Sequence, residues 1–293
     1  MIEEEHMKKI VAIALAALMM GTAFSGCGGG EPASQEAQKP TQTTPEEPSE
    51  EKKEEKSTTY GTAEEGKFVL GLDDSLPPMG FRDENNEIVG FDIDIAQAVC
   101  DNLGLELVLQ PINWDTKEME LETGNIDVIW NGLTITPERQ ESMLLSKPYL
   151  NNNQVICVKA DSEISSKAEL AGKTVAVQAG SSADDALMKD AISSEIAEKL
   201  EYDNNVSALL DCKIGGCDAV ILDEVVANYY AAKEPESYKV LEESLQKEEY
   251  AIAFKKGNTK LHDAVMAEYD KLAEDGTLSK ISQQWFGKDI IVK

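Results

Sequence analysis

The chain has 293 residues, which is enough for one large domain or two of ordinary size. Its 55 acidic and 27 basic residues give a formal net charge of -28 at pH 7, and the acidic excess extends through residues 67–293. Such a chain is repelled by phosphate, so we expect no nucleic-acid partner. The simplest role of this charge is to keep the chain soluble.

The first 26 residues predict a secretory signal peptide. Lys8 and Lys9 precede an uncharged apolar run from Ile10 to Met20, and small residues follow. This is the order of a signal peptide and its cleavage site, and the run is too short for a comfortable membrane span. Because the opening MIEEEH is acidic where such signals are basic, we expect the true start at Met7.

The stretch FSGC, Phe24 to Cys27, resembles a bacterial lipobox. In such signals the cysteine is lipidated and becomes the new N-terminus, and two or more acyl chains would anchor the protein stably. Phe24 stands where Leu is usual, so an ordinary cleaved signal with a chance cysteine is the alternative. The resemblance predicts lipidation at Cys27.

Residues 28–66 predict a flexible, acidic tether. They are rich in Gly, Glu, Pro, Thr and Lys and hold almost no large apolar side chain. Such a segment buries too little surface to offset its ordering entropy. Random-coil scaling gives it a reach of roughly 30–40 Å, which would lift a folded domain off a membrane surface.

The contexts of the other four cysteines favour free thiols or a disulfide over a metal site. Cys100 and Cys157 lie in apolar stretches, so we expect buried free thiols. Cys212 and Cys217 flank KIGG and could close a small disulfide loop or remain reduced. The two histidines lack the spacing of metal ligands, so we expect no metal and no cofactor.

From residue 67 onward, the apolar pattern predicts alternating strands and helices. The expected strands are 67–73, 105–111 and 126–135, and the expected helices are 92–103 and 114–124. Asp92 can cap the first helix, and Gly104 can end it in a left-handed turn. A segment of loops and a turn separates the first strand from this helix. The β–α–β–α–β order predicts a parallel sheet flanked by helices.

The alternation of strands and helices begins again after about residue 150. A strand is expected at 151–160, and Thr174–Gln178 forms another before a Gly-Ser-Ser turn and a helix. Helix, turn, strand and helix follow over residues 207–232, then a strand at 249–257 and two amphipathic helices. Two tandem α/β units predict two lobes with a cleft, and ligands in such folds bind beyond the carboxyl ends of the strands.

Seven stretches, in order, resemble the family-3 extracellular solute-binding proteins of ABC importers. They are GFDIDIAQAV, GNIDVIWNGLTITPER, LSKPYL, ELAGKTVAVQAGSS, GGCDAVILDEVVANYY, YAIAFKKGN and DGTLSKISQQWFG, and they lie in family order within residues 67–288. The resemblance implies a two-lobe, type II periplasmic-binding-protein-like α/β fold with two crossing hinge segments. Residues 67–151 with 250–293 would form lobe 1, and 152–249 would form lobe 2.

The resemblance also implies the function. The chain would bind a free L-amino acid, or a close derivative such as cystine, outside the cell. It would deliver this ligand to the permease and ATPase of an ABC importer. It would be an exported monomer, held by its lipid on the outer face of a bacterial cell membrane, and not an enzyme.

The loop after strand 126–135 is implied to hold the ligand's α-carboxylate. Arg139 matches the family's arginine, and its fork of donors suits a carboxylate. Asn131, Gly132 and Thr134 match positions whose backbone and hydroxyl groups line the cleft. Gly132 would let the ligand approach the backbone closely.

The second lobe is implied to complete the site. Ser181 and Ser182 stand in the loop whose amides and hydroxyl bind the carboxylate, where Thr is usual. A helix is expected to begin there, and its N-terminal amides add positive potential. Asp223 matches the aspartate that binds the α-ammonium. Asp92 could face a cationic ligand side chain, but the helix cap is the preferred interpretation.

The residues around the ligand's side chain depart from the family. Asp73 matches a first-loop aspartate, but Leu76 stands where an aromatic is frequent and Met79 where Phe is common. Trp114 lies at another ligand-packing position, and Trp130 adds an indole nearby in sequence. Either tryptophan could belong to the core instead. A rearranged stacking wall is therefore expected.

Two other function classes remain as alternatives. An enzyme on the same fold, such as a cyclohexadienyl-type dehydratase, would use Asp73 or Glu224 as an acid. The sequence shows no nucleophile elbow, histidine base or lyase domain that supports it. An extracellular amino-acid sensor is the third class. The sequence does not identify the amino acid.

Overall fold

We describe a computed structural model of the chain, for residues 59–292. The described residues belong to one compact unit, Glu54–Lys293. The predicted signal peptide, Cys27 and nearly all of the predicted tether lie outside the described residues. Within them, no helix combines the length and apolar character needed to cross a membrane.

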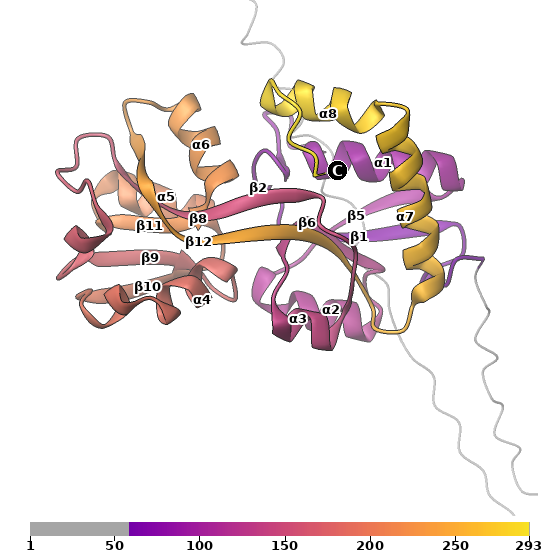
Figure 1. The fold of residues 1–293 in the computed structure, drawn as a ribbon, viewed down its shortest axis with the longest axis horizontal. Helices are drawn as coiled ribbons and strands as arrows, with labels where there is room; N and C mark the ends of the chain where they lie inside the picture. The colour runs from indigo at the N-terminus through magenta and orange to yellow at the C-terminus, as the bar shows by residue number, and fades with distance from the viewer. Residues whose placement is uncertain (1–58, 293) are drawn as a thin grey trace, which may run out of the picture. The chain divides into compact units, whose positions relative to one another are not determined.

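One large mixed sheet organises the unit (Figure 1), in the order β10-β9-β11-β8-β12-β6-β1-β5, with β7 against β12. β1 is parallel to β5 and β6, and β9 is parallel to β10 and β11, so two parallel blocks form as predicted. The strands are β1 Lys67–Leu72, β5 Glu106–Pro111, β6 Val128–Thr134, β7 Leu144–Leu145, β8 Leu150–Lys159, β9 Thr174–Gln178, β10 Glu198–Tyr202, β11 Ala219–Asp223 and β12 Tyr238–Phe254.

The antiparallel strands β8 and β12 join the two blocks. They run side by side between the β9–β11 block and the β1–β5–β6 block (Figure 1). In their register Asn152 lies opposite Glu248, and β11 pairs with the other edge of β8, where Asp223 lies opposite Gln154. The side chains at the centre of the sheet therefore come from three adjacent strands.

Eight α-helices are described. In the first block they are α1 Phe91–Leu103, α2 Lys117–Thr123, α3 Pro137–Ser142, α7 Thr259–Glu274 and α8 Thr277–Phe286. In the second block they are α4 Ser182–Lys189, α5 Asn205–Ile214 and α6 Glu224–Lys233. Short 3-10 turns are η1 Trp114–Thr116, η2 Lys167–Leu170 and η3 Ala191–Ser194. The predicted helix at 114–124 is thus a 3-10 turn followed by α2.

The segment expected as loops holds a small antiparallel sheet, β2 Ser75–Leu76, β3 Gly80–Arg82 and β4 Ile88–Val89. The predicted cap of α1 is wrong. Gly90 holds the N-cap position without a side-chain hydrogen bond, and Asp92 is buried inside the first turn. The C-terminal end of α1 is as predicted, because Gly104 adopts a left-handed conformation with φ of 69°.

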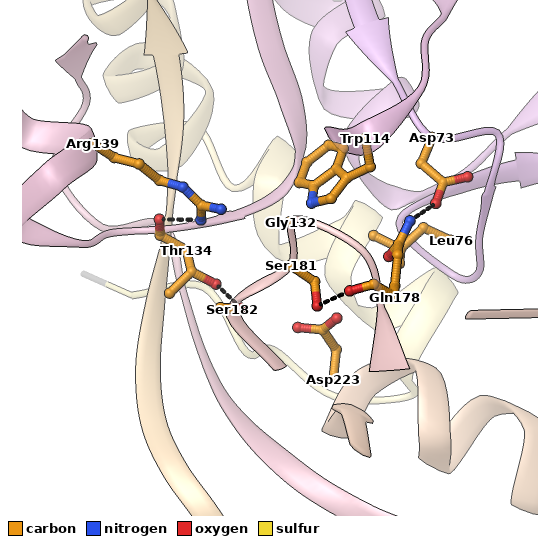
Figure 2. Close-up of a pocket in the computed structure, with 10 residues that line it drawn as sticks. All are labelled: Asp73, Leu76, Trp114, Gly132, Thr134, Arg139, Gln178, Ser181, Ser182 and Asp223. Atoms are coloured by element: carbon orange, nitrogen blue, oxygen red, sulfur yellow. Dashed lines mark hydrogen bonds between the residues drawn. The ribbon is translucent and has the colours of Figure 1, made fainter. Parts of the chain in front are cut away.

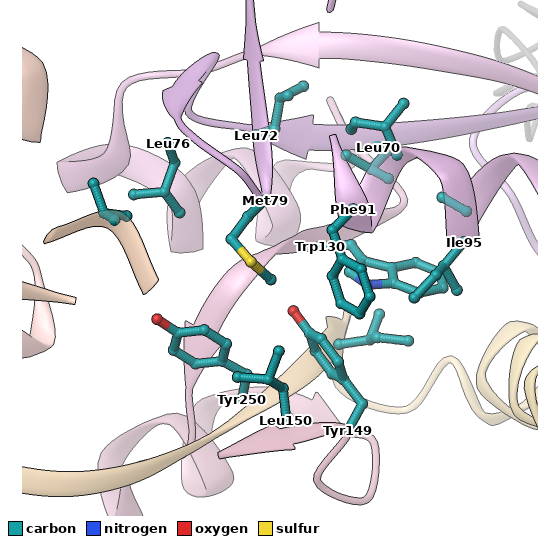
Figure 3. Close-up of a cluster of buried hydrophobic side chains, with 14 of the residues drawn as sticks. Leu70, Leu72, Leu76, Met79, Phe91, Ile95, Trp130, Tyr149, Leu150 and Tyr250 are labelled. Carbon is teal, nitrogen blue, oxygen red and sulfur yellow. The ribbon is translucent and has the colours of Figure 1, made fainter. Parts of the chain in front are cut away.

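The larger core cluster of the first block lies between the large sheet and the helices α1, α7 and α8, and Figure 3 shows part of it. Trp130 and Met79 are fully buried there, so both belong to the core rather than to a ligand wall. The four described cysteines are buried free thiols. Burial raises the pKa of the Cys100 and Cys157 thiols to about 12. No disulfide joins Cys212 and Cys217.

Candidate functional site

A closed pocket lies between the two parallel blocks. Its lining residues are Asp73, Leu76, Trp114, Gly132, Thr134, Arg139, Gln178, Ser181, Ser182 and Asp223 (Figure 2). All but Gln178 were expected from the sequence. The free volume inside is about 10 Å³, room for about one water molecule. A larger ligand can therefore enter only when the two walls separate.

Arg139 is aimed into this pocket by the start of α3. Thr136 caps the helix by accepting a hydrogen bond from the Arg139 amide at 3.2 Å, and Pro137 follows as its first residue. The Arg139 side chain is 5% exposed, and its Nη1 donates to the Thr134 carbonyl at 2.9 Å. Its Nε lies 3.8 Å from the half-exposed carboxylate of Glu118. The guanidinium thus keeps much of its donor capacity for an anion in the pocket.

The opposite wall begins at the N-terminus of α4. Ser181 caps this helix by accepting from the Asp184 amide at 3.2 Å, and its hydroxyl donates to the Gln178 carbonyl at 2.7 Å. Ser182 opens the helix, and its Oγ lies 2.9 Å from Thr134 Oγ1 across the pocket. The amides at the start of α4 add positive potential beside Arg139.

A carboxylate stands at the end of β11. Asp223 Oδ1 accepts from Asn152 Nδ2 at 2.8 Å, Gln154 Nε2 at 2.9 Å and the Tyr250 hydroxyl at 2.6 Å. Burial raises the pKa of Asp223 to about 7, and the nearby negative charge of Glu248 adds to the effect. This end of the pocket therefore attracts a cation.

The far end of the pocket is polar on one side and apolar on the other. Asp73 Oδ2 accepts from Gln178 Nε2 at 2.7 Å, and Asp73 Oδ1 accepts from the Ser75 amide at 2.9 Å. Burial raises the pKa of Asp73. Leu76 and Trp114 supply the apolar surface, and each is nearly buried. This end offers acceptors and an indole to a ligand side chain.

Two predicted polar residues lie behind the pocket wall. Asn131 does not line the pocket; its Oδ1 accepts from the Asp73 amide at 3.1 Å. Asp92 Oδ2 accepts from the Gly132 amide and the Tyr149 hydroxyl, each at 3.0 Å. Burial raises the pKa of Asp92 to about 8. Asp92 therefore fixes the pocket backbone and faces no ligand side chain, contrary to that alternative.

Sequence reasoning missed Lys117, which joins the two walls. Lys117 is 3% exposed, and its ammonium donates to the Trp114 carbonyl at 3.0 Å and to the Gly180 carbonyl of the opposite wall at 2.9 Å. Burial, with the positive charge of Arg139, lowers the pKa of Lys117 to about 8. No sequence signal marked this residue, because its partners are backbone carbonyls. In the described part of the chain no cluster of side chains suits a metal ion.

Comparison with known proteins identifies the class. The model of the bacterial extracellular solute-binding proteins, family 3, matches residues 68–288, and the chain belongs to this family. The L-cystine-binding protein TcyJ of Escherichia coli is 30% identical over 229 residues, which cover 78% of this chain and 85% of TcyJ. The arginine-binding extracellular protein ArtP of Bacillus subtilis is 30% identical, covering 78% of this chain and 92% of ArtP.

Solved structures agree on the fold. A substrate-binding protein of an ABC uptake transporter from Streptococcus pneumoniae with bound histidine is 36% identical, with a TM-score of 0.75. The alignment covers 78% of this chain and 95% of that one. An ancestral arginine-binding protein bound to arginine is 37% identical, with a TM-score of 0.72, over 76% and 99% of the two chains. The type II periplasmic-binding fold is confirmed, and these relatives are binding proteins rather than enzymes.

Proposed function

We propose that the chain binds a free L-amino acid outside the cell and delivers it to an ABC importer. The observation that carries this is the placing of Arg139 and Asp223 in one closed pocket, on different walls. The guanidinium suits an α-carboxylate and Asp223 suits an α-ammonium. A free amino acid presents both groups, so it can bridge the two walls.

The walls correspond to two lobes. Residues 67–151 with 250–293 form lobe 1 and carry Arg139, and residues 152–249 form lobe 2 and carry Ser182 and Asp223. The strands β8 and β12 are the hinge. Since closure buries both Arg139 and Asp223, it is favoured when a ligand pairs them, and a ligand shifts the equilibrium only by its differential affinity for the closed form.

The far end of the pocket selects which amino-acid side chain the protein binds. Asp73 and Gln178 offer oxygens that accept hydrogen bonds, and Trp114 offers a flat apolar face. A side chain with N–H donors at its end suits these groups. Cystine, arginine, histidine and glutamine, which the similar proteins are described as binding, all carry such donors.

Scattering with two matched ligands tests the clamp. An amino acid with free α-groups should reduce the radius of gyration of the purified domain, and its carboxylate-blocked amide should not. Mass spectrometry of material that co-purifies with the domain supplies the candidates, and a thermal-shift screen ranks them. An unchanged radius at saturation, or equal compaction by the amide, would contradict the proposal. Formation of a product from a bound candidate would instead support the enzyme alternative.

We propose that Cys27 is lipidated and that residues 28–66 link the anchor to the binding domain, which acts as a monomer. Support comes from the FSGC stretch and the signal-like segment before it, and from membership in a family of extracellular proteins.

A further inference from the structure

A second carboxylate stands beside Asp223, and neither the motif nor the pocket lining pointed to it. Glu248 lies on β12 and is 7% exposed. Asn152 Nδ2 donates to Glu248 Oε1 at 2.7 Å and to Asp223 Oδ1 at 2.8 Å. Gln154 Nε2 donates to the same two oxygens, at 2.8 Å and 2.9 Å. The two carboxylates are thus held together by the same two amide nitrogens.

The strands of the large sheet hold the Asp223–Glu248 pair together, so the pair does not depend on closure of the pocket. Asp223 ends β11, the two amides come from β8, and Glu248 lies on β12. In the strand register Asp223 is opposite Gln154, and Glu248 is opposite Asn152. Because these three strands are neighbours, separation of the two walls leaves the pair assembled.

The groups around the pair leave it without a cation in direct contact. Tyr250 donates its hydroxyl to Asp223 at 2.6 Å. Arg139, on the opposite wall, attracts both carboxylates electrostatically, but its Nη1 donates to the Thr134 carbonyl. Glu224, which follows Asp223 in the chain, accepts from Asn153. Among residues 59–292, no ion pair involves either member of the pair.

Two buried like charges without a cation in direct contact are disfavoured, and a shared proton relieves the repulsion between them. Two observations fit a bound proton. Burial, together with the negative charge of Glu248, raises the pKa of Asp223 to about 7. The second oxygen of Glu248, Oε2, is buried and has no hydrogen-bond partner, so it is available to accept a hydrogen bond from a protonated Asp223.

We propose that Asp223 holds a proton against Glu248 in the ligand-free site and releases it when the ligand's α-ammonium arrives. The proton passes from the Asp223 carboxyl group to solvent, while the ammonium keeps its own protons and becomes the counterion of the pair. Amino-acid binding is therefore linked to proton release. This inference rests on the proposed function, because it requires a cationic α-amino group at this end of the pocket.

The direction of the pH dependence follows from linkage. The free site binds a proton below about pH 7, and the occupied site binds it only at lower pH. Affinity should therefore rise with pH up to about 7 and level off above it. One released proton limits the slope to about tenfold per pH unit, or about a hundredfold between pH 8 and pH 5.

Calorimetry in two buffers that differ in ionisation enthalpy measures the released proton directly. The probes are L-arginine, L-glutamine and L-cystine, whose α-ammonium groups do not titrate near pH 6. We expect close to one proton released per bound ligand at about pH 6 and nearly none at about pH 8. Glu248→Gln removes the like charge and should lower the release at pH 6 severalfold. Glu249→Gln, an exposed neighbour on the same strand, is the matched control and should behave as wild type.

The outcomes separate the two proposals. If a probe binds wild-type protein and no proton is released at pH 6, the inference is overturned while the proposed function stands. Equal proton release by Glu248→Gln and wild type would also overturn it, because the pair would then play no part. If mass spectrometry and the thermal-shift screen yield no amino acid that binds at pH 8, the proposed function fails and takes this inference with it. The wild-type measurement decides the matter even if the Glu248→Gln variant does not fold.

Discussion

Replacement of Arg139 by alanine is the most direct test of the pocket. Arg139 is 5% exposed, and the carboxylate that pairs with it, Glu118, is 3.8 Å away and half-exposed. The structure therefore leaves the guanidinium to an anion in the pocket. Removing it would leave a ligand carboxylate desolvated and short of its counterion.

The expected loss follows from the number of hydrogen bonds. A hydrogen bond to a charged group contributes about 1.5–3 kcal/mol net, and a fork makes two of them. Breaking one side of a buried pair costs about 3–5 kcal/mol. This corresponds to roughly a hundredfold to several thousandfold weaker binding. The hydrogen bond to the Thr134 carbonyl is lost as well, so the stability of the empty protein must be measured separately.

The chain offers a matched control, because Arg82 is a partly exposed arginine that pairs with Asp74 at 2.6 Å outside the pocket. Arg82→Ala removes the same charge and should bind the amino acid within about twofold of wild type. Arg139→Lys keeps the charge but loses the fork, so an intermediate loss is expected. If calorimetry finds that Arg139→Ala binds within threefold of wild type while still folded, the carboxylate assignment is wrong.

Three further predictions concern closure, pH and anchoring. A Cβ at Gly180, whose φ is +65°, would lie 2.9 Å from the Asp115 Cα across the pocket. Gly180→Ala should therefore weaken binding at least about tenfold in calorimetry, more than Gly172→Ala, which has a similar φ and open space. Because burial raises the pKa of Asp92 to about 8, stability should fall as pH rises from 3.8 towards 8, and Asp92→Asn should flatten this trend in pH-dependent melting. Cys27→Ser should release protein into the medium or leave unprocessed precursor on immunoblots, and mature-length protein retained in the membrane would contradict the lipid anchor.

Local signals in the sequence were sufficient where short-range chemistry decides the structure. The strand–loop–helix segment that carries Arg139 could be predicted because Thr136 and Pro137 begin a helix by local rules. The left-handed end of α1 at Gly104 is of the same kind. The two tandem α/β units followed from apolar periodicity, and the ordered motifs then predicted which of their loops meet at the pocket.

It was harder to predict which face of a strand or helix meets the pocket and which meets the core. The sequence left open whether Trp114 and Trp130 face the cleft or the core, and the structure places the first in the pocket lining and the second fully buried in the core. Strand β6 is buried on both faces, so alternation along it gives no signal of which side meets ligand. The short strands β2 to β4 were missed because runs of two or three residues carry no usable period.

The sequence by itself determined the class of protein, the order of its elements and most of the residues around the pocket, since motifs, helix caps and apolar periods are local properties of the chain. Only the tertiary structure decided which buried polar groups pair. Gln178 meets Asp73, Lys117 meets the Gly180 carbonyl, and Glu248 shares two amides with Asp223. Each of these partnerships joins segments that are distant in the chain, and a buried polar group is placed by whichever partner packing brings within reach. No local pattern records that partner.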